Sequence, residues 1–287
     1  MKSLDGKTKL DNIRVLDACT IINLLRIDND NYLSNILISD LSLNIAQIVY
    51  DEIRKNIKKN PLDDESQKRI DMLLPSFIMK INKDIEIPKD LNTEYYDELI
   101  QFSKHKKKKN GELVSSALSL ILCRENNSKV LFYTDDFPAK EQFAQYFEYQ
   151  QIGYIGDSVD LLLWWFCSQP NFTLIYLKEY LTRLRGEYNT DLVNFCKAFE
   201  KLSNSLTIKE RKDKNLFNNI QNIVNGYYHN HDNMLKGIYY FSENKKYDQV
   251  NCIIDKYDVT QLISTPLITK KINNVLAYLD NYHIFKI

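Results

Sequence analysis

Residues that interrupt regular structure are scarce in this sequence. It has 7 glycines and 6 prolines among 287 residues, so we expect many helices and few sharp turns. Hydrophobic residues make up 44% and charged residues 26%, which is the composition of a packed, soluble protein and excludes a disordered chain. The length suits two domains, at roughly 150 residues for each domain.

Paired cysteines, a signal peptide and a long apolar run are also lacking. The five cysteines are scattered and odd in number, without a C-x-x-C pair, which argues against a disulfide framework or a structural zinc site. The N-terminal stretch MKSLDGKTKLDN is polar, unlike a signal peptide. The most apolar stretch, residues 161–167, falls short of the roughly 20 residues that span a bilayer, and we interpret it as a buried helix. We therefore expect a soluble, cytoplasmic protein without membrane contact.

Net charge is absent as well, because 38 basic and 38 acidic residues cancel. Any contact with nucleic acid must then come from a local basic patch. The run Lys104-His-Lys-Lys-Lys-Lys109 is such a patch, and Lys106, Lys107, Lys108 and Lys109 are candidate phosphate-binding residues. The alternative is a solvated loop, which is the usual role of a charge run.

Apolar patterning changes near residue 169. Before that point, strand-like runs at 13–17, 43–46, 130–133 and 151–153 alternate with helical spacing at 21–25, 48–53, 92–104, 112–124, 138–147 and from 157. This alternation predicts an α/β domain over residues 1–168, with a parallel sheet and helices on both faces. After it, apolar stripes at 174–184 and 192–202 and similar stretches at 216–226, 232–241 and 247–255 predict an all-α domain over residues 169–287.

Acidic residues stand at the ends of the elements predicted for the first domain. Asp17 ends the first strand, and Asp135 and Asp136 follow the third. Ligands of open parallel sheets bind at the carboxyl ends of the strands, so we expect these side chains to converge. Glu52 and Glu112 lie on predicted helices that can present them at the same edge. Together they form a set of candidate catalytic carboxylates.

Clustered carboxylates repel one another, and such a cluster persists when it holds cations. Oxygen ligands suit Mg²⁺ or Mn²⁺ rather than zinc. The candidate metal ligands are Asp17, Glu112, Asp135 and Asp136, with Glu52 as a further catalytic acid. One cation lowers the pKa of a bound water and a second steadies the leaving oxygen, so the pattern predicts hydrolysis of phosphodiester bonds.

Four segments resemble, in order, the motifs of the PIN-domain nuclease family. They are LDACTIINLL at 16–25, IVYDEI at 48–53, GELVSSAL at 111–118 and YTDD at 133–136, and residues 152–162 resemble the closing strand and helix of VapC-like members. The resemblance covers about residues 13–168. It implies a metal-dependent endoribonuclease acting on RNA, as a toxin or defence effector restrained by an inhibitory protein partner. It also implies a homo-oligomer.

The chain departs from the family pattern at two places. Cys19 stands where the family often has Ser or Thr, and Glu112 stands where many members have Asp. In the fourth motif the usual T-x-D frame selects Asp136, but Asp135 is an equally available neighbour, so the pattern assigns metal contact to neither. Thr134 is suited to orienting a carboxylate, a water or the substrate.

Each acid also has a structural interpretation. Asp17, Asp135 and Asp136 are suited to capping helices, and Glu112 would favour the dipole at a helix start. The competing hypothesis for the whole chain is a catalytically idle PIN scaffold that binds RNA or protein, and DNA is the alternative substrate. We interpret the aromatic residues at 227–228 and 239–241 as core rather than as a surface for stacking bases.

Overall fold

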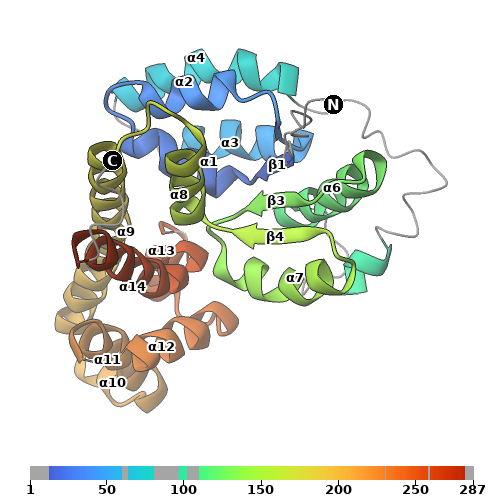
Figure 1. Ribbon diagram of the computed structural model, residues 1–287. Helices are drawn as coiled ribbons and strands as arrows, with labels where there is room; N and C mark the ends of the chain where they lie inside the picture. The colour runs from blue at the N-terminus through green and yellow to red at the C-terminus, as the bar shows by residue number, and fades with distance from the viewer. Residues whose placement is uncertain are drawn as a thin grey trace, which may run out of the picture. The chain divides into compact units, whose positions relative to one another are not determined.

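The computed structural model describes residues 13–59, 64–80, 97–101, 110–229, 231–257 and 259–281. The chain divides into two compact units, one ending at Tyr180 and one beginning at Leu181. The N-terminal unit contains β1 (Ile13–Leu16), α1 (Ala18–Ile27), α2 (Tyr32–Ser39), β2 (Leu43–Asn44), α3 (Gln47–Lys59), α4 (Asp64–Lys80), α6 (Gly111–Asn126), β3 (Val130–Tyr133), α7 (Phe137–Tyr149), β4 (Gly153–Gly156), α8 (Ser158–Ser168) and the start of α9 (Leu174–Ser205) (Figure 1).

The sheet of this unit has four parallel strands in the order β2-β1-β3-β4. Leu16 pairs with Tyr133, and Tyr133 pairs with Gly156. The strands β1, β3 and β4 therefore end level with one another, and the residues that follow them meet at one edge. The predicted α/β class with a parallel sheet is confirmed.

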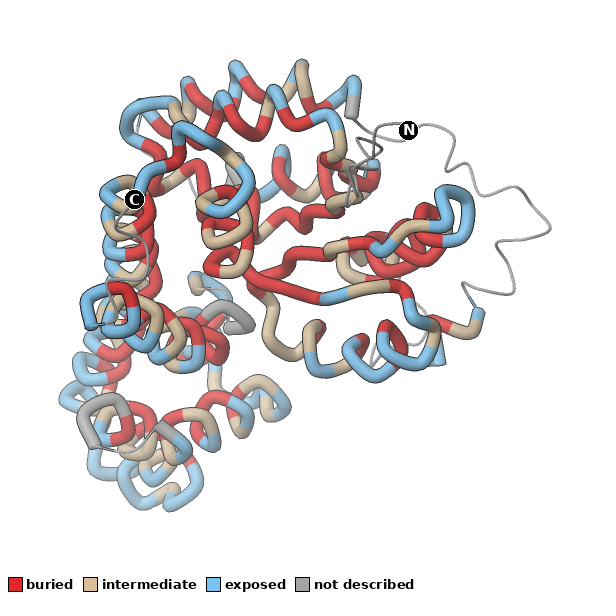
Figure 2. The backbone as a smooth tube through the Cα atoms, viewed as in Figure 1, coloured by how far each residue is buried: buried red, intermediate tan, exposed pale blue. Residues whose placement is uncertain are grey.

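Helices pack on both faces of the sheet, as Figures 1 and 2 allow the reader to follow. Successive side chains of a strand point to opposite faces. On one face Val15 and Phe132 are fully buried, and the ring of Phe147 in α7 lies 6.1 Å from that of Phe132. On the other face the guanidinium of Arg14 lies over the ring of Trp164 in α8, at 5.6 Å. The apolar stretch 161–167 is thus part of a packed helix.

An ion pair links β1 to the residue that ends α2. The guanidinium of Arg14 donates to both carboxylate oxygens of Asp40, at 2.9 and 2.7 Å, and both side chains are largely buried. Burial alone would raise the pKa of Asp40, but the hydrogen bonds and charge of Arg14 outweigh it and lower that pKa. This pair fixes the chain next to the short edge strand β2.

Strand β4 begins later than the predicted strand at 151–153. Gln151 and Gly153 both have positive φ angles, of 52° and 156°, so the chain turns before it joins the sheet. A side chain at Gly153 would overlap the carbonyl oxygen of Val130, which is why glycine stands there. Of the predicted helix at 92–104, only residues 97–101 are described, and they are helical.

Aromatic residues connect the start of α9 to the start of α2 and the loop before it. The rings of Tyr32 and Tyr176 stack with centroids 4.8 Å apart, and Phe172 lies 5.8 Å from Tyr32. The hydroxyl of Tyr180 donates to Asp30 at 2.7 Å. The compact N-terminal unit therefore reaches Tyr180, whereas the sequence pattern changes near residue 169.

Helices are the only regular elements among the described residues of the C-terminal unit. After the rest of α9 it contains α10 (Ile208–Arg211), α11 (Lys214–His229), α12 (His231–Glu243), α13 (Asp248–Ile254) and α14 (Val259–Asn281). Its core is a cluster that includes Phe195, Phe199 and Phe241. The two stripes predicted at 174–184 and 192–202 belong to one continuous helix rather than two.

The aromatic residues of α12 are divided between the core and the surface. Phe241 is buried and Tyr240 packs partly against the core, as predicted. Tyr239 is 48% exposed, so its assignment to the core is wrong. One face of the helix carries Ile238 and Phe241 inward, and Tyr239, the residue after Ile238, points away from that face. The side chains at 227–228 lie outside the described residues.

Candidate active site

The site is built from the residues that follow β1 and β3. The amide of Asp17 donates to the carbonyl of Tyr133 at 3.0 Å, which continues the pairing of the strands by one residue. The Thr134 hydroxyl then donates to Asp17 Oδ2 at 3.1 Å, across 117 residues of sequence. The Cys19 thiol donates to the same oxygen, also at 3.1 Å. The parallel register thus brings the first and fourth motifs together.

The second oxygen of Asp17 has no hydrogen-bond partner although it is buried. Residue Asp17 is 3% exposed. A Cβ atom at Gly111 would lie 3.0 Å from Asp17 Oδ1 and would overlap Glu52 Oε2. The amide of Gly111 donates to the other oxygen of Glu52, at 3.1 Å. Asp17, Glu52 and the start of α6 therefore meet at one point, and a Cβ at residue 111 would force the Glu52 carboxylate to shift.

Glu112 stands in the first turn of α6, beside this meeting point. The Asn110 side chain caps the helix by accepting from the amide of Leu113 at 3.1 Å. This cap fixes the first helical turn, which carries Glu112. Burial raises the pKa of Glu112 to about 9, and the charges of Asp17, Asp136 and then Glu52 add to the effect. The charges of these three carboxylates thus act on Glu112.

Asp17 and Glu52 are also shifted towards the protonated form. Burial raises the pKa of Asp17 despite its hydrogen bonds with Cys19 and Thr134. The pKa of Glu52 rises to about 7 because of burial and the charge of Asp17, while the Gly111 amide and the charge of Lys55 oppose the rise. Ionised together, these groups would repel strongly, so this group of acids favours either protons or a cation.

The neighbours Asp135 and Asp136 have different surroundings. Asp135 is buried, and both of its oxygens accept hydrogen bonds: Oδ2 from the Asn23 amide at 2.8 Å and from the Ser158 hydroxyl, and Oδ1 from the Ser158 amide at 2.7 Å. Burial raises the pKa of Asp135, and the hydrogen bonds from these donors only partly oppose the rise. Asp135 therefore joins α1 and α8 to the end of β3. Asp136 is half-buried, and its charge acts on Glu112.

The capping interpretation holds for one of these acids. Asp136 caps α7 by accepting from the amide of Ala139 at 3.0 Å, and its own amide donates to Thr134. Asp17 occupies the residue before α1, but its side chain makes no capping hydrogen bond. Its carboxylate is instead turned towards Thr134 and Gly111. Capping thus accounts for the position of Asp136 but not for that of Asp17.

Several residues that support the site were not singled out in the sequence. Asn23 is a buried polar residue among the mainly apolar buried residues of α1, and this mismatch was the available signal. Ser158 follows Asp157, which caps α8 in a capping box with Asp160. Lys140 of α7 binds Asp157 at 2.8 Å. These contacts hold the helices that surround the acids.

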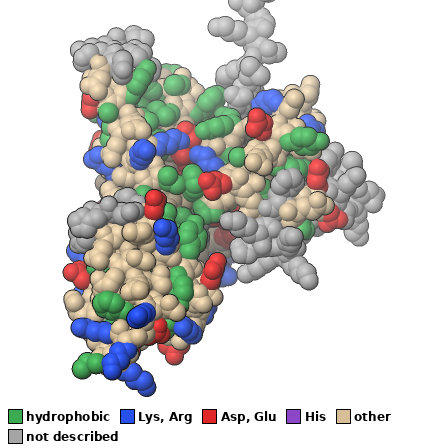
Figure 3. All heavy atoms as spheres, turned by 90° about the horizontal axis from the view of Figure 1, so that it is seen from below, with side chains coloured by type: hydrophobic (Ala, Val, Ile, Leu, Met, Phe, Trp, Pro, Cys, Tyr) green, Lys and Arg blue, Asp and Glu red, His purple; other side chains and the backbone are tan. Residues whose placement is uncertain are grey.

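The basic run that we predicted to bind phosphate is not among the described residues. Lys106, Lys107, Lys108 and Lys109 lie outside the described residues. In the part of the chain that is described, no group of three or more His, Cys, Asp or Glu side chains is arranged to hold a metal ion. No described helix has the length and apolar character needed to cross a membrane. On the face drawn in Figure 3, the described basic and acidic side chains are interspersed.

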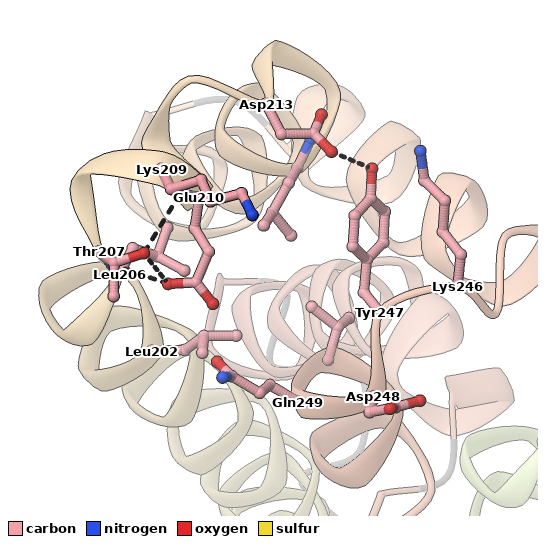
Figure 4. A pocket seen from close by; sticks show the side chains of 12 residues that line it. Leu202, Leu206, Thr207, Lys209, Glu210, Asp213, Lys246, Tyr247, Asp248 and Gln249 are labelled. Atoms are coloured by element: carbon pink, nitrogen blue, oxygen red, sulfur yellow. Dashed lines mark hydrogen bonds between the residues drawn. The ribbon is translucent and has the colours of Figure 1, made fainter.

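A cavity of about 560 Å³ lies in the C-terminal unit, and none of the candidate acids lines it. Its apolar lining comes from core residues such as Leu202 and Val250. Figure 4 shows Tyr247 turned towards Asp213, to which its hydroxyl donates at 3.0 Å, and Glu210 turned towards Thr207 in a capping box. The polar groups named here are therefore satisfied within the unit.

The fold and the site together define an α/β unit with a cluster of carboxylates at the carboxyl edge of a parallel sheet. No family model, no curated protein and no solved structure matches the chain. The resemblance to the PIN family accordingly rests on the four sequence motifs.

Proposed function

We propose that the chain is a metal-dependent nuclease of the PIN kind that hydrolyses RNA with Mg²⁺ or Mn²⁺. The observation that carries the proposal is the meeting of Asp17, Glu52 and Glu112 around Gly111, with Asp17 Oδ1 buried and without a donor. An unpaired buried carboxylate oxygen beside two further carboxylates is unfavourable unless a cation neutralises them. Perturbed acids of this kind are typical of functional sites.

The donor set fits a hard divalent cation, because it consists of carboxylate oxygens. Asp17, Glu112 and Asp136 would hold the ion, and Glu52 would complete the charge. Asp135 is less suited, since its oxygens already accept from Asn23 and Ser158. As no three described carboxylates are yet arranged for an ion, the proposal requires their side chains to adjust on binding.

The cation would supply a water of lowered pKa and would neutralise charge on the phosphate. The chain's own groups would orient the site. The Thr134 hydroxyl and the Cys19 thiol fix one oxygen of Asp17 and leave Oδ1 directed towards Gly111. The Gly111 amide fixes one oxygen of Glu52. RNA as the substrate comes from the family resemblance, as do the toxin or defence role, the inhibitory partner and the homo-oligomer.

The test combines cleavage and melting of the full chain. Asp17→Asn should reduce Mn²⁺-dependent cleavage of RNA by about a thousandfold or more and should remove the rise in melting temperature that the ion gives the wild type. Asp248→Asn, which neutralises an exposed acid of the C-terminal unit, is the matched control and should behave like wild type. Full activity in the Asp17→Asn variant would overturn the proposal.

The competing hypotheses are separate outcomes of the same assay. An idle scaffold would bind RNA equally well with and without divalent metal, and replacing carboxylates would not change its binding. A DNA nuclease would reveal itself when single-stranded RNA and single-stranded DNA of the same sequence are offered side by side. Preferential cleavage of the RNA strand supports the proposed substrate.

A further inference from the structure

Lys55 places a positive charge beside the carboxylate cluster. It lies three residues after Glu52 on α3, and residues at this spacing are neighbours on one helix surface. Helical geometry turns the two side chains only about 60° apart around the axis. Glu52 is half-buried and points to Gly111, whereas Lys55 is exposed. The positive charge of Lys55 opposes the rise in the pKa of Glu52.

The neighbouring cation Arg54 is arranged differently. It projects about 160° from Glu52 around the helix axis, and its guanidinium lies over the ring of Tyr50 at 5.8 Å. Lys55 makes no hydrogen bond or ion pair with the residues that the structure describes. Of these two adjacent basic residues, only Lys55 is therefore directed to the rim of the acid cluster with its ammonium group available.

We propose that Lys55 binds a phosphate of the nucleic-acid backbone and holds the scissile strand over the carboxylate cluster. This inference rests on the proposed nuclease function and adds a substrate-binding residue to it. The physical need is plain, because a polyanion must approach several carboxylates. A flexible ammonium beyond the metal-binding acids attracts the phosphate without competing for the ion. A contact of this kind gives affinity but no sequence preference.

The experiment measures cleavage of single-stranded RNA oligonucleotides by the full chain at saturating Mn²⁺. Lys55→Met removes the charge and keeps an unbranched side chain, Lys55→Arg keeps the charge, and Arg54→Met is the matched control. We expect Lys55→Met to raise KM by about three- to tenfold, as for one lost charge-assisted contact, while kcat stays close to the wild-type value. The loss should be the same for oligonucleotides of different sequence.

The dependence on salt gives a second readout that a merely structural role would not change. Loss of one phosphate contact to a single strand should reduce the slope of log KM against log salt by about 0.7. Lys55→Arg should restore both KM and the slope. Weaker metal binding cannot produce this result, because removing a cation beside the carboxylates favours the bound ion.

The outcomes separate this inference from the function on which it rests. If wild type cleaves RNA and Lys55→Met matches Arg54→Met in KM and in salt slope, the role of Lys55 is wrong and the nuclease proposal stands. If wild type shows no metal-dependent cleavage of either RNA or DNA, the nuclease proposal fails and this inference fails with it.

Discussion

The pKa values of acids at the sheet edge of the N-terminal unit are shifted in the opposite direction from those of two acids in the C-terminal unit. In the C-terminal unit, hydrogen bonds from the Thr207 side chain and backbone lower the pKa of Glu210, and the Leu216 amide and the Tyr247 hydroxyl lower that of Asp213. At the sheet edge of the N-terminal unit, burial and mutual repulsion raise the pKa of Glu52 and Glu112. Carboxylates that serve the fold are stabilised in place, whereas those at the edge are held at a cost in stability, which is the usual mark of a working site.

The largest expected effect comes from filling the space between the carboxylates. Gly111→Ala would push a methyl group against the carboxylates of Asp17 and Glu52 and displace them, so we expect both the metal-dependent rise in melting temperature and RNA cleavage to be strongly reduced. Gly186→Ala is the control, because a Cβ there meets nothing within 4 Å. It should keep full activity and gain about 1 kcal/mol of stability from the better helix propensity. Wild-type cleavage by Gly111→Ala would show that the two acids do not act together.

The next effect concerns an acid of the N-terminal unit that serves the fold. Asp40→Asn leaves the buried charge of Arg14 unpaired and should lower the free energy of unfolding by about 3 kcal/mol at pH 7. Because the folded-state pKa of Asp40 is lowered, its stabilisation is present above the unfolded value and is lost as pH falls through the folded one. Urea unfolding at neutral and acidic pH measures this, and an equal stability difference at both would contradict it.

Glu112 should show the opposite dependence on pH in the metal-free protein. Its folded pKa of about 9 exceeds the ordinary value of 4.5, so the folded chain keeps a proton that the unfolded chain releases between those values. Stability should fall as pH rises through this window, by at most about 1.4 kcal/mol per pH unit from this one group. Glu112→Gln should flatten the slope, and Glu179→Gln, which replaces an exposed acid, should not. A slope that is the same in both variants would sink the expectation.

The smallest effect is expected in the C-terminal unit. Tyr247→Phe removes one hydrogen bond to Asp213 and should lower the melting temperature by only about a few degrees. The rise in melting temperature with Mn²⁺ should be the same as in wild type. Loss of the rise in melting temperature with Mn²⁺ would contradict the separation of the acids of the two units.

The strand ends could be predicted from sequence because apolar runs mark β1 and β3 directly. A parallel sheet then brings the residues after those strands together, so the proximity of Asp17 to Thr134 followed from the pattern alone. The distinct surroundings of Asp135 and Asp136 did not follow. They depend on donors from Asn23 and Ser158, which are far away in sequence from these acids, and the polar character of Asn23 among apolar neighbours was the one local signal.

Other features depend on packing that periodicity does not report. Two apolar stripes with a gap between them read as two helices, although the chain continues through residue 186 as a single helix. The close approach of Glu52 to Gly111 is a tertiary contact across 59 residues. The third motif indicated a glycine at position 111. The structure gives the reason, which is the carboxylate of Glu52 beside it.

The aromatic contacts at the start of α9 decide where a stable fragment of the N-terminal unit can end. A chain cut at residue 168 would lose Phe172, Tyr176 and Tyr180, and would uncover the ring of Tyr32 and leave Asp30 without the hydroxyl donor of Tyr180. Such a fragment would present an exposed aromatic surface, and we expect it to aggregate during expression. A fragment that runs through Tyr180 keeps that surface closed, so biochemists who wish to isolate the acid cluster should begin with the longer version.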